Sequence, residues 1–130
     1  RFVIGSSSSF GEISSIEGIS YLRNLTKISL LNDAAKPMKE LPDEIYSMVN
    51  MQIIHISRSD IKEVSPKIGN LVNLKTLHLK SCHITGLPDE LINCISLREL
   101  NISYTDITEV PAVLFSMPNV KVSMEGTNVK

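Results

Sequence analysis

Apolar residues return at a fixed interval along most of the chain. Four similar phrases begin 23 residues apart, at Leu41, Val64, Leu87 and Val110. Each phrase contains apolar residues about three positions apart, followed by an apolar pair two positions apart, such as Leu77 and Leu79. The first spacing is typical of a helical turn, and the second is typical of a strand with alternate residues buried. Each repeat is therefore predicted to hold one helical turn and one short strand.

The strands are expected at a matching place in every repeat, near Phe2–Ile4, Lys27–Leu30, Ile53–Ile56, Thr76–Leu79 and Glu99–Ile102, with Val122–Met124 as a possible sixth. The interval lengthens to 26 towards the N-terminus, and the last phrase matches the others only if one residue is deleted. A unit of this length cannot bury its own apolar face, so neighbouring units must stack into one continuous core. The strands should then lie side by side in a parallel sheet on a concave face.

The repeated phrases resemble the leucine-rich repeat (LRR) family. Its pattern L-x-x-L-x-L-x-x-N/C-x-L matches LKTLHLKSCHI (74–84) and LRELNISYTDI (97–107). The resemblance implies an α/β fold, a right-handed solenoid with a concave parallel β-sheet and helical or irregular convex turns. We expect a single LRR domain over residues 1–130, with repeats at 2–27, 28–53, 54–76, 77–99 and 100–130, the last carrying a C-terminal cap.

Within the family, three features most resemble the recognition domains of plant intracellular immune receptors of the NLR type. They are a proline after the opening residue (Pro42, Pro88 and Pro111), phrases such as IGNLVNLKTLHLKSC (68–82), and Cys or Thr at the position that usually holds Asn. Short repeats of bacterial and signalling-scaffold proteins are also similar. The resemblance implies a receptor role in plant defense or disease resistance, with a cytoplasmic location in that case. Two alternatives stay open: a structural or autoinhibitory segment of a larger chain, and a secreted pathogen effector.

The family pattern has Asn or Cys at one position, which in this chain holds Asp33, Ser59, Cys82 and Thr105. Only Cys82 is one of the usual residues. In the family this side chain donates hydrogen bonds to backbone carbonyls of the turn that leaves the strand. Hydroxyl and thiol groups can donate one such bond, whereas an ionised Asp33 can only accept. The first position of this polar ladder is therefore expected to differ from the others.

Composition removes several classes of function. The 130 residues carry 13 Lys and Arg against 14 Asp and Glu, a balance that excludes a basic nucleic-acid arm as the main feature. Two cysteines make no disulfide framework, and no apolar run is long enough to span a bilayer, so a membrane is not expected as a partner. The first residue is Arg1 rather than Met, which predicts that the chain is either processed or cut from a longer protein, and further domains of a parent chain are expected as partners.

Catalytic and cofactor motifs are missing from the sequence, which lacks a G-x-S-x-G, an H-E-x-x-H, a P-loop and a C-x-x-C pair. We therefore expect a protein that is not an enzyme and that needs no cofactor. His55 and His78 occupy the same position in consecutive repeats and should be neighbours, roughly 4.8 Å apart, with the protonation of one of them depressed. A metal would need more ligands, and the same column offers only Ser29 and Asn101.

The outward positions of the strands form the candidate binding face. Five bases against Glu99 alone give this face a positive excess, which would steer an acidic protein partner towards it, although charges can also segregate by accident. Nucleic acid is the weaker interpretation, because Tyr104 is the only aromatic residue there. The candidate partner-binding residues are Lys27, Gln52, Ile53, His55, Arg58, Lys75, His78, Lys80, Arg98, Asn101 and Tyr104.

Overall fold

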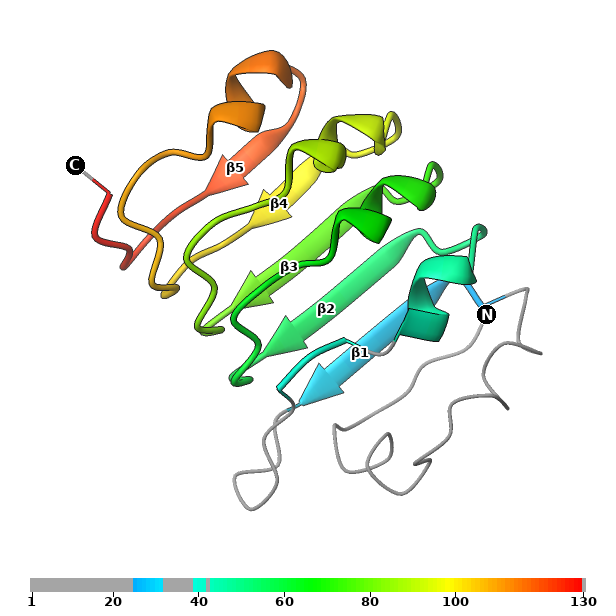
Figure 1. Ribbon diagram of the computed structural model, residues 1–130, viewed down its shortest axis with the longest axis horizontal. Coiled ribbons are helices and arrows are strands. Elements are labelled where there is room, and N and C mark those ends of the chain that lie inside the picture. Colours follow the sequence, from blue (N-terminus) through cyan, green and yellow to red (C-terminus); the bar gives the residue numbers. More distant parts are fainter. Residues whose placement is uncertain (1–24, 32–38, 42, 130) are drawn as a thin grey trace.

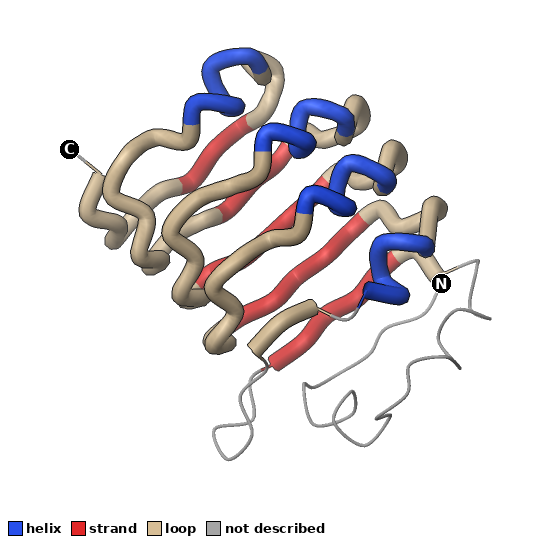
Figure 2. The backbone as a smooth tube through the Cα atoms, viewed as in Figure 1, coloured by secondary structure: helices blue, strands red, loops and turns tan. Residues whose placement is uncertain are grey.

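The computed structural model describes residues 25–31, 39–41 and 43–129. They form one open parallel sheet in the order β1-β2-β3-β4-β5, so consecutive strands are always neighbours (Figure 1). The strands are β1 (Lys27–Leu31), β2 (Ile53–Ser57), β3 (Thr76–Lys80), β4 (Glu99–Asn101) and β5 (Lys121–Ser123). Short 3₁₀ helices connect them: η2 (Asp43–Ser47), η3 (Pro66–Asn70), η4 (Asp89–Asn93) and η5 (Ala112–Ser116). Figure 2 shows these helices and their loops as a second layer over one face of the sheet.

The register between strands confirms the repeat derived from the sequence. Lys27, Ile53, Thr76, Glu99 and Lys121 are paired in series, which gives sequence offsets of 26, 23, 23 and 22. Strands occur at five of the predicted places, and the offset of 22 confirms the single deletion in the last repeat. The predicted strand Phe2–Ile4 lies outside the described residues. The division of the whole chain into five repeats of one domain therefore stays a prediction.

Backbone hydrogen bonds at the start of each strand show where that deletion falls. The carbonyl of Gln52 accepts from the N–H groups of both Lys75 and Thr76, at 2.8 and 3.1 Å. One repeat later, the carbonyl of Lys75 accepts from two successive N–H groups in the same way. Only one N–H, that of Lys121, reaches the carbonyl of Arg98. The missing residue is therefore the one that would stand in register with Arg98, immediately before β5.

The layer over the sheet consists of 3₁₀ turns because the repeat leaves too few residues for an α-helix. In each repeat an N–H at the end of the helix bonds the carbonyl three residues earlier, as from Leu71 to Ile68 and from Cys94 to Leu91. A second bond of the same kind follows at once, as from Leu74 to Leu71. These two turns place apolar residues three positions apart on one side, towards the sheet.

The core is a stack of aliphatic side chains that continues from repeat to repeat. The central column contains Ile28, Ile54, Leu77 and Leu100, all completely buried. Val122 continues this column but is only partly buried, because β5 is the edge strand of the described sheet. Within the described ranges, no helix has the length and apolar character needed to cross a bilayer.

A column of buried polar side chains runs beside the apolar core, as the family pattern predicts. The Ser59 hydroxyl donates to the Cys82 sulfur at 3.1 Å, and the Cys82 thiol points to the Lys80 carbonyl at 3.8 Å. Thr105 and Thr127 each donate to the carbonyl three residues earlier, at 2.7 and 2.8 Å. Cys82, Thr105 and Thr127 thus point their donors at carbonyls of the turns, whereas the Ser59 hydroxyl donates to a sulfur instead. Asp33 lies outside the described residues.

The backbone turns sharply immediately after each strand. Arg58, Ser81 and Tyr104 adopt positive φ angles of 58°, 60° and 57°, and Gly126 takes the same place with φ 70°. A left-handed conformation costs a residue with a β-carbon roughly 1 kcal/mol. The surrounding structure must therefore stabilise this conformation at the same turn of three successive repeats. The N–H groups of Arg58, Ser81 and Tyr104 all bond carbonyls of the next repeat, which supplies that support.

Loss of buried volume between the repeats should destabilise the solenoid. We expect Leu100→Ala to lower the free energy of unfolding by about 3 kcal/mol, because the completely buried side chain would leave a cavity. Ile95→Ala is the matched control, since Ile95 is 71% exposed, and it should change the free energy by less than about 0.5 kcal/mol. Urea unfolding followed by circular dichroism measures both values. Equal losses in the two variants would contradict this description of the core.

Candidate functional site

All eleven candidate binding residues lie on the sheet surface that faces away from the 3₁₀ helices, or at its margins. Register places them in adjacent columns: Lys27 beside Ile53, and His55 beside His78, which lies beside Asn101. Ser103, whose position in the strand pattern predicts an outward side chain, is buried instead. Ser103 is only 4% exposed, because the chain leaves β4 after Asn101 and the Ser103 N–H bonds the Asn101 Oδ1 at 2.9 Å.

The two histidines predicted to be neighbours stack on each other at the centre of this surface. The ring centroids of His55 and His78 are 4.3 Å apart, and the ring planes differ by 6°. His78 Nε2 is buried without a hydrogen bond, and Glu99 Oε1 lies 3.2 Å from it. A protonated His78 ring would form an ion pair with Glu99 there. The pair is therefore partly exposed, and a carboxylate on the next strand lies against its His78 ring.

Burial lowers the pKa of His55 below its ordinary value of 6.5, and the charges of His78 and Lys27 lower it further. Glu99 acts in the opposite direction. This confirms that the protonation of one member of the pair is depressed. Below pH 6.5 the unfolded chain then binds more protons at His55 than the folded chain does, so this group reduces stability as the pH falls through that value.

Tyr104 anchors the margin of the surface where the strands end. The Lys80 ammonium lies 5.5 Å from the centre of its ring, and the Tyr104 hydroxyl donates to Glu125 Oε1 at 3.2 Å. That hydrogen bond, with the carboxylate charge, raises the pKa of Tyr104. A β-carbon at Gly126 would come within 2.3 Å of the tyrosine ring, so only glycine lets the ring lie over the backbone. The ring remains 48% exposed and available to a partner.

Arg98 turns towards the margin where the strands begin. Its guanidinium donates to the carbonyls of Ile95 and Leu97 at 3.2 and 2.9 Å. These bonds hold the Arg98 charge at the border between the sheet and the preceding turn. Lys75, in the same position one repeat earlier, is exposed there too.

The charge excess of the sheet surface extends to the fifth strand. Register adds Lys121 beside Glu99, and Glu125 takes the outward position after β5. Across the described strands and their ends, six basic side chains therefore stand against two acidic ones, an excess of four. The basic residues are Lys27, Arg58, Lys75, Lys80, Arg98 and Lys121.

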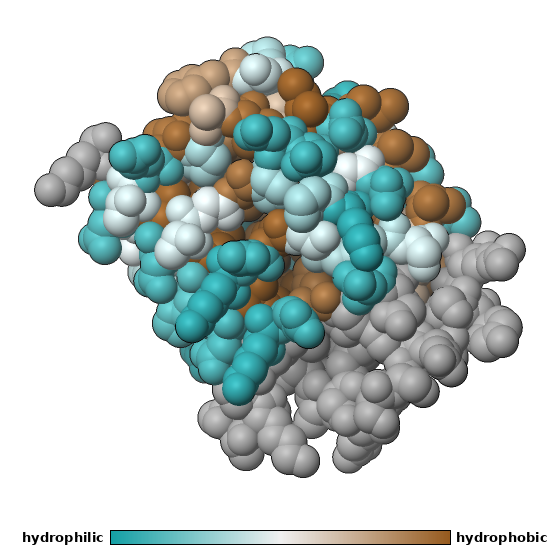
Figure 3. All heavy atoms as spheres, in the orientation of Figure 1, coloured by the Kyte–Doolittle hydropathy of each residue, from teal (hydrophilic) through white to brown (hydrophobic). Residues whose placement is uncertain are grey.

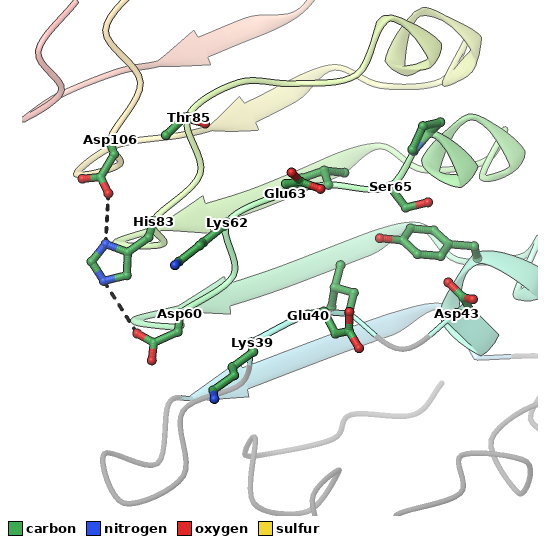
Figure 4. A pocket seen from close by; sticks show the side chains of 14 residues that line it. Lys39, Glu40, Asp43, Asp60, Lys62, Glu63, Ser65, His83, Thr85 and Asp106 are labelled. Atoms are coloured by element: carbon green, nitrogen blue, oxygen red, sulfur yellow. Dashed lines mark hydrogen bonds and ion pairs between the residues drawn. The ribbon is translucent and has the colours of Figure 1, made fainter.

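Sequence reasoning missed a groove on the opposite, loop-covered side. It has a volume of about 1020 Å³, and its lining includes Tyr46, Lys62 and His83 (Figure 4). His83 Nδ1 lies 3.1 Å from Asp106 and its Nε2 lies 3.7 Å from Asp60, as the dashed lines of Figure 4 show. The signal was present, because Asp60, His83 and Asp106 recur at the interval of 23 in consecutive repeats.

The two cysteines have the separate roles expected from their positions. Cys82 belongs to the polar ladder, and Cys94 is buried in the core, where its thiol donates to the Ile68 carbonyl at 3.1 Å. Burial raises the pKa of Cys94 to about 11, which keeps the thiol protonated for that bond. Neither cysteine is in a disulfide. In the part of the chain that the structure describes, no group of three or more His, Cys, Asp or Glu residues is arranged to hold a metal.

Comparison with protein families identifies the architecture. Residues 9–114 match the family described as a leucine-rich repeat region, and this match covers most of the chain. The chain therefore belongs to the leucine-rich repeat family, as its sequence pattern indicated. No curated protein sequence matches it significantly.

Solved structures show the same solenoid fold. An LRR protein of Leptospira interrogans matches with a TM-score of 0.74 and 25% identity, over 85% of this chain and 28% of that protein. The ectodomain of the receptor kinase SOBIR1 from Arabidopsis thaliana matches with a TM-score of 0.69 and 19% identity, over 85% of this chain and 61% of that one. The ectodomain of the Arabidopsis thaliana receptor kinase GASSHO1/SCHENGEN3, in complex with CASPARIAN STRIP INTEGRITY FACTOR 2, matches with a TM-score of 0.62 and 22% identity, over 79% of this chain and 13% of that one. The chain spans less than two thirds of each. The narrower resemblance to plant intracellular immune receptors stays a prediction.

Replacing one ring of the stacked pair separates burial from charge as causes of the lowered pKa of His55. In His78→Phe, an uncharged ring keeps His55 covered, so its pKa should rise but stay below 6.5, because burial is the larger cause. Titration of the His55 ring protons by NMR measures this value. A pKa at or above 6.5 in the variant would show that charge repulsion dominates instead.

Proposed function

We propose that this LRR module binds a protein partner, without catalysis, through the surface of its sheet. The observation that carries the proposal is the register of outward side chains over five strands, which gives a continuous surface with the stacked histidines at its centre and Tyr104 at its margin. Leucine-rich repeat proteins are typically recognition modules rather than enzymes. The ectodomain of GASSHO1/SCHENGEN3, which shares the fold, is in a complex with CASPARIAN STRIP INTEGRITY FACTOR 2, and this supports the proposal.

The surface suits protein contact because its anchors are already fixed before binding. Tyr104 is held by Glu125 and Lys80, and His55 is held by His78, so little side-chain freedom is lost when a partner covers them. Tyrosine and arginine are the residue types that contribute most often to binding energy in protein interfaces. The half-exposed Tyr104 beside Lys80, and the exposed Arg58 at the matching turn two repeats earlier, fit that description.

The partner should present an acidic surface. An excess of four positive charges on one side of a nearly neutral chain steers an acidic molecule to that side and raises the rate of association. The partner can be a separate protein or another domain of a longer chain to which this module belongs. An immune-type receptor role is a narrower form of the proposal, supported by the proline and repeat phrases that resemble plant receptors and by the plant receptor kinases that share the fold.

Charge reversal on the sheet surface tests this function. We expect Arg58→Glu/Lys80→Glu to lose at least tenfold of the partner captured by the wild-type protein from an extract of the source organism, because two attractive charges become repulsive. The matched control is Lys39→Glu/Lys62→Glu, which makes the same change of charge at exposed residues of the opposite groove. Quantitative mass spectrometry measures the captured proteins, and circular dichroism checks that each variant is folded.

The two variants give separate outcomes. Loss in the sheet variant with retention in the control supports recognition by the sheet. Retention of every captured protein by the sheet variant would overturn the proposal, and loss in the control variant alone would move the binding site to the groove of Figure 4.

A further inference from the structure

A second surface of the solenoid lies along the margin where its strands begin. We name it the strand-start edge and define it as the four segments that run from within each 3₁₀ helix to the start of the next strand: 45–52, 68–75, 91–98 and 114–121. These 32 positions contain no Asp or Glu, and their charged residues are Lys75, Arg98 and Lys121. The chain as a whole carries 14 acidic residues, so this edge is unlike the rest of the molecule.

Exposed apolar side chains concentrate on the same edge. Of the six large hydrophobic residues exposed in the described chain, five belong to it, and the sixth is Tyr104. The five, with exposed fractions, are Val49 (50%), Val72 (41%), Ile92 (47%), Ile95 (71%) and Phe115 (76%). The core positions of these segments are filled by other residues, such as Leu71 and Leu97, so the exposed ones are not needed for the fold. Exposed apolar residues that cluster in this way mark an interaction surface.

The repeat arranges these side chains in two parallel rows. Val49, Val72 and Ile95 occupy one position in three consecutive repeats, and Ile92 and Phe115 occupy another position three residues earlier. Figure 3 shows apolar atoms gathered along the upper right rim, the side on which the strands of Figure 1 begin. Gly69 precedes Ile92 in the second row, and a β-carbon there would come within 2.8 Å of the Glu90 carbonyl. The second row therefore has no side chain at Gly69, and its apolar side chains protrude at Ile92 and Phe115.

We propose that the strand-start edge binds an amphipathic helix of a partner protein, one with acidic residues beside its apolar stripe. Successive residues of each row come from successive repeats, whose strands are roughly 4.8 Å apart in the sheet. Two such rows of apolar side chains can receive the apolar stripe of a helix, whose residues three and four apart are about 5–6 Å apart.

Charge decides the chemistry of this helix. Lys75, Arg98 and Lys121 follow the rows at the start of successive strands, and the bonds from Arg98 to the Ile95 and Leu97 carbonyls hold its guanidinium beside the most exposed isoleucine. Glu99, the first residue of β4, lies in register with Lys121, so three bases stand against one carboxylate where these strands begin. An acidic flank on the helix would therefore meet a net positive charge. A second copy of this chain fits less well, because two such edges would bring like charges together.

The apolar rows of this site are distinct from the sheet surface, although the bases Lys75, Arg98 and Lys121 lie at the border of both. The rows contain none of the residues that carry the sheet proposal, His55, His78 and Tyr104. The variants that test one leave the other unchanged, which makes their failures distinguishable.

Two designed peptides of about 18 residues probe the strand-start edge. Both have leucines at positions i, i+3, i+4 and i+7, and the flanking residues are glutamate in one and lysine in the other. We expect the glutamate peptide to bind at least tenfold more tightly by fluorescence anisotropy, and to shift the amide NMR signals of Ile92, Ile95 and Phe115. Ile95→Ser/Phe115→Ser should weaken it at least tenfold. Arg58→Glu/Lys80→Glu should leave its affinity unchanged.

Other outcomes overturn the proposal. No binding of the glutamate peptide at millimolar concentration, equal binding of both peptides, or shifts confined to His55, His78 and Tyr104 would each contradict it. Vesicles of phosphatidylcholine with phosphatidylserine provide the remaining comparison. Sedimentation of the protein with them, lost in Ile95→Ser/Phe115→Ser, together with no binding of the peptide, would assign the edge to an anionic lipid surface instead.

Discussion

Burial of aliphatic side chains between neighbouring repeats is the interaction on which the rest of this structure depends. A single repeat has one strand and two 3₁₀ turns and cannot enclose its own apolar residues. Stacking places Ile28, Ile54, Leu77 and Leu100 in one column from which water is excluded. The parallel ladder and the polar column of Ser59, Cys82 and Thr105 then satisfy the backbone and turn groups that this stacking buries.

The same constraint explains why the surfaces can differ so strongly in charge. Core positions are fixed by packing, so only the positions between them are free to vary. On the sheet these positions carry a positive excess, on the strand-start edge they carry apolar and basic residues without acids, and the groove on the other side contains carboxylates such as Asp60 and Asp106 around His83. A nearly neutral chain thus presents three chemically distinct surfaces on one rigid frame.

Local conformation ties the candidate binding residues to that frame. Arg58 and Tyr104 adopt positive φ angles after their strands, and the next repeat holds them there through backbone hydrogen bonds. Tyr104 also requires a glycine at position 126 beneath its ring. The candidate binding residues Arg58 and Tyr104 are therefore positioned by interactions between repeats rather than by their own repeat alone.

The sequence by itself determined the family, the parallel order of the strands, and the bounds of the described strands to within about one residue, because apolar positions 23 residues apart must stack for any of them to be buried. It also placed His55 beside His78. The interval of 23 also puts Asp60, His83 and Asp106 in one column. Only the tertiary structure decided that Arg98 bonds the carbonyls of Ile95 and Leu97, that Ser103 is buried, and that the His83 ring turns its two nitrogens to Asp60 and Asp106. The physical reason is that periodicity fixes which positions share a column, whereas the direction of a long or polar side chain depends on hydrogen-bond partners from neighbouring turns, which no repeat pattern encodes.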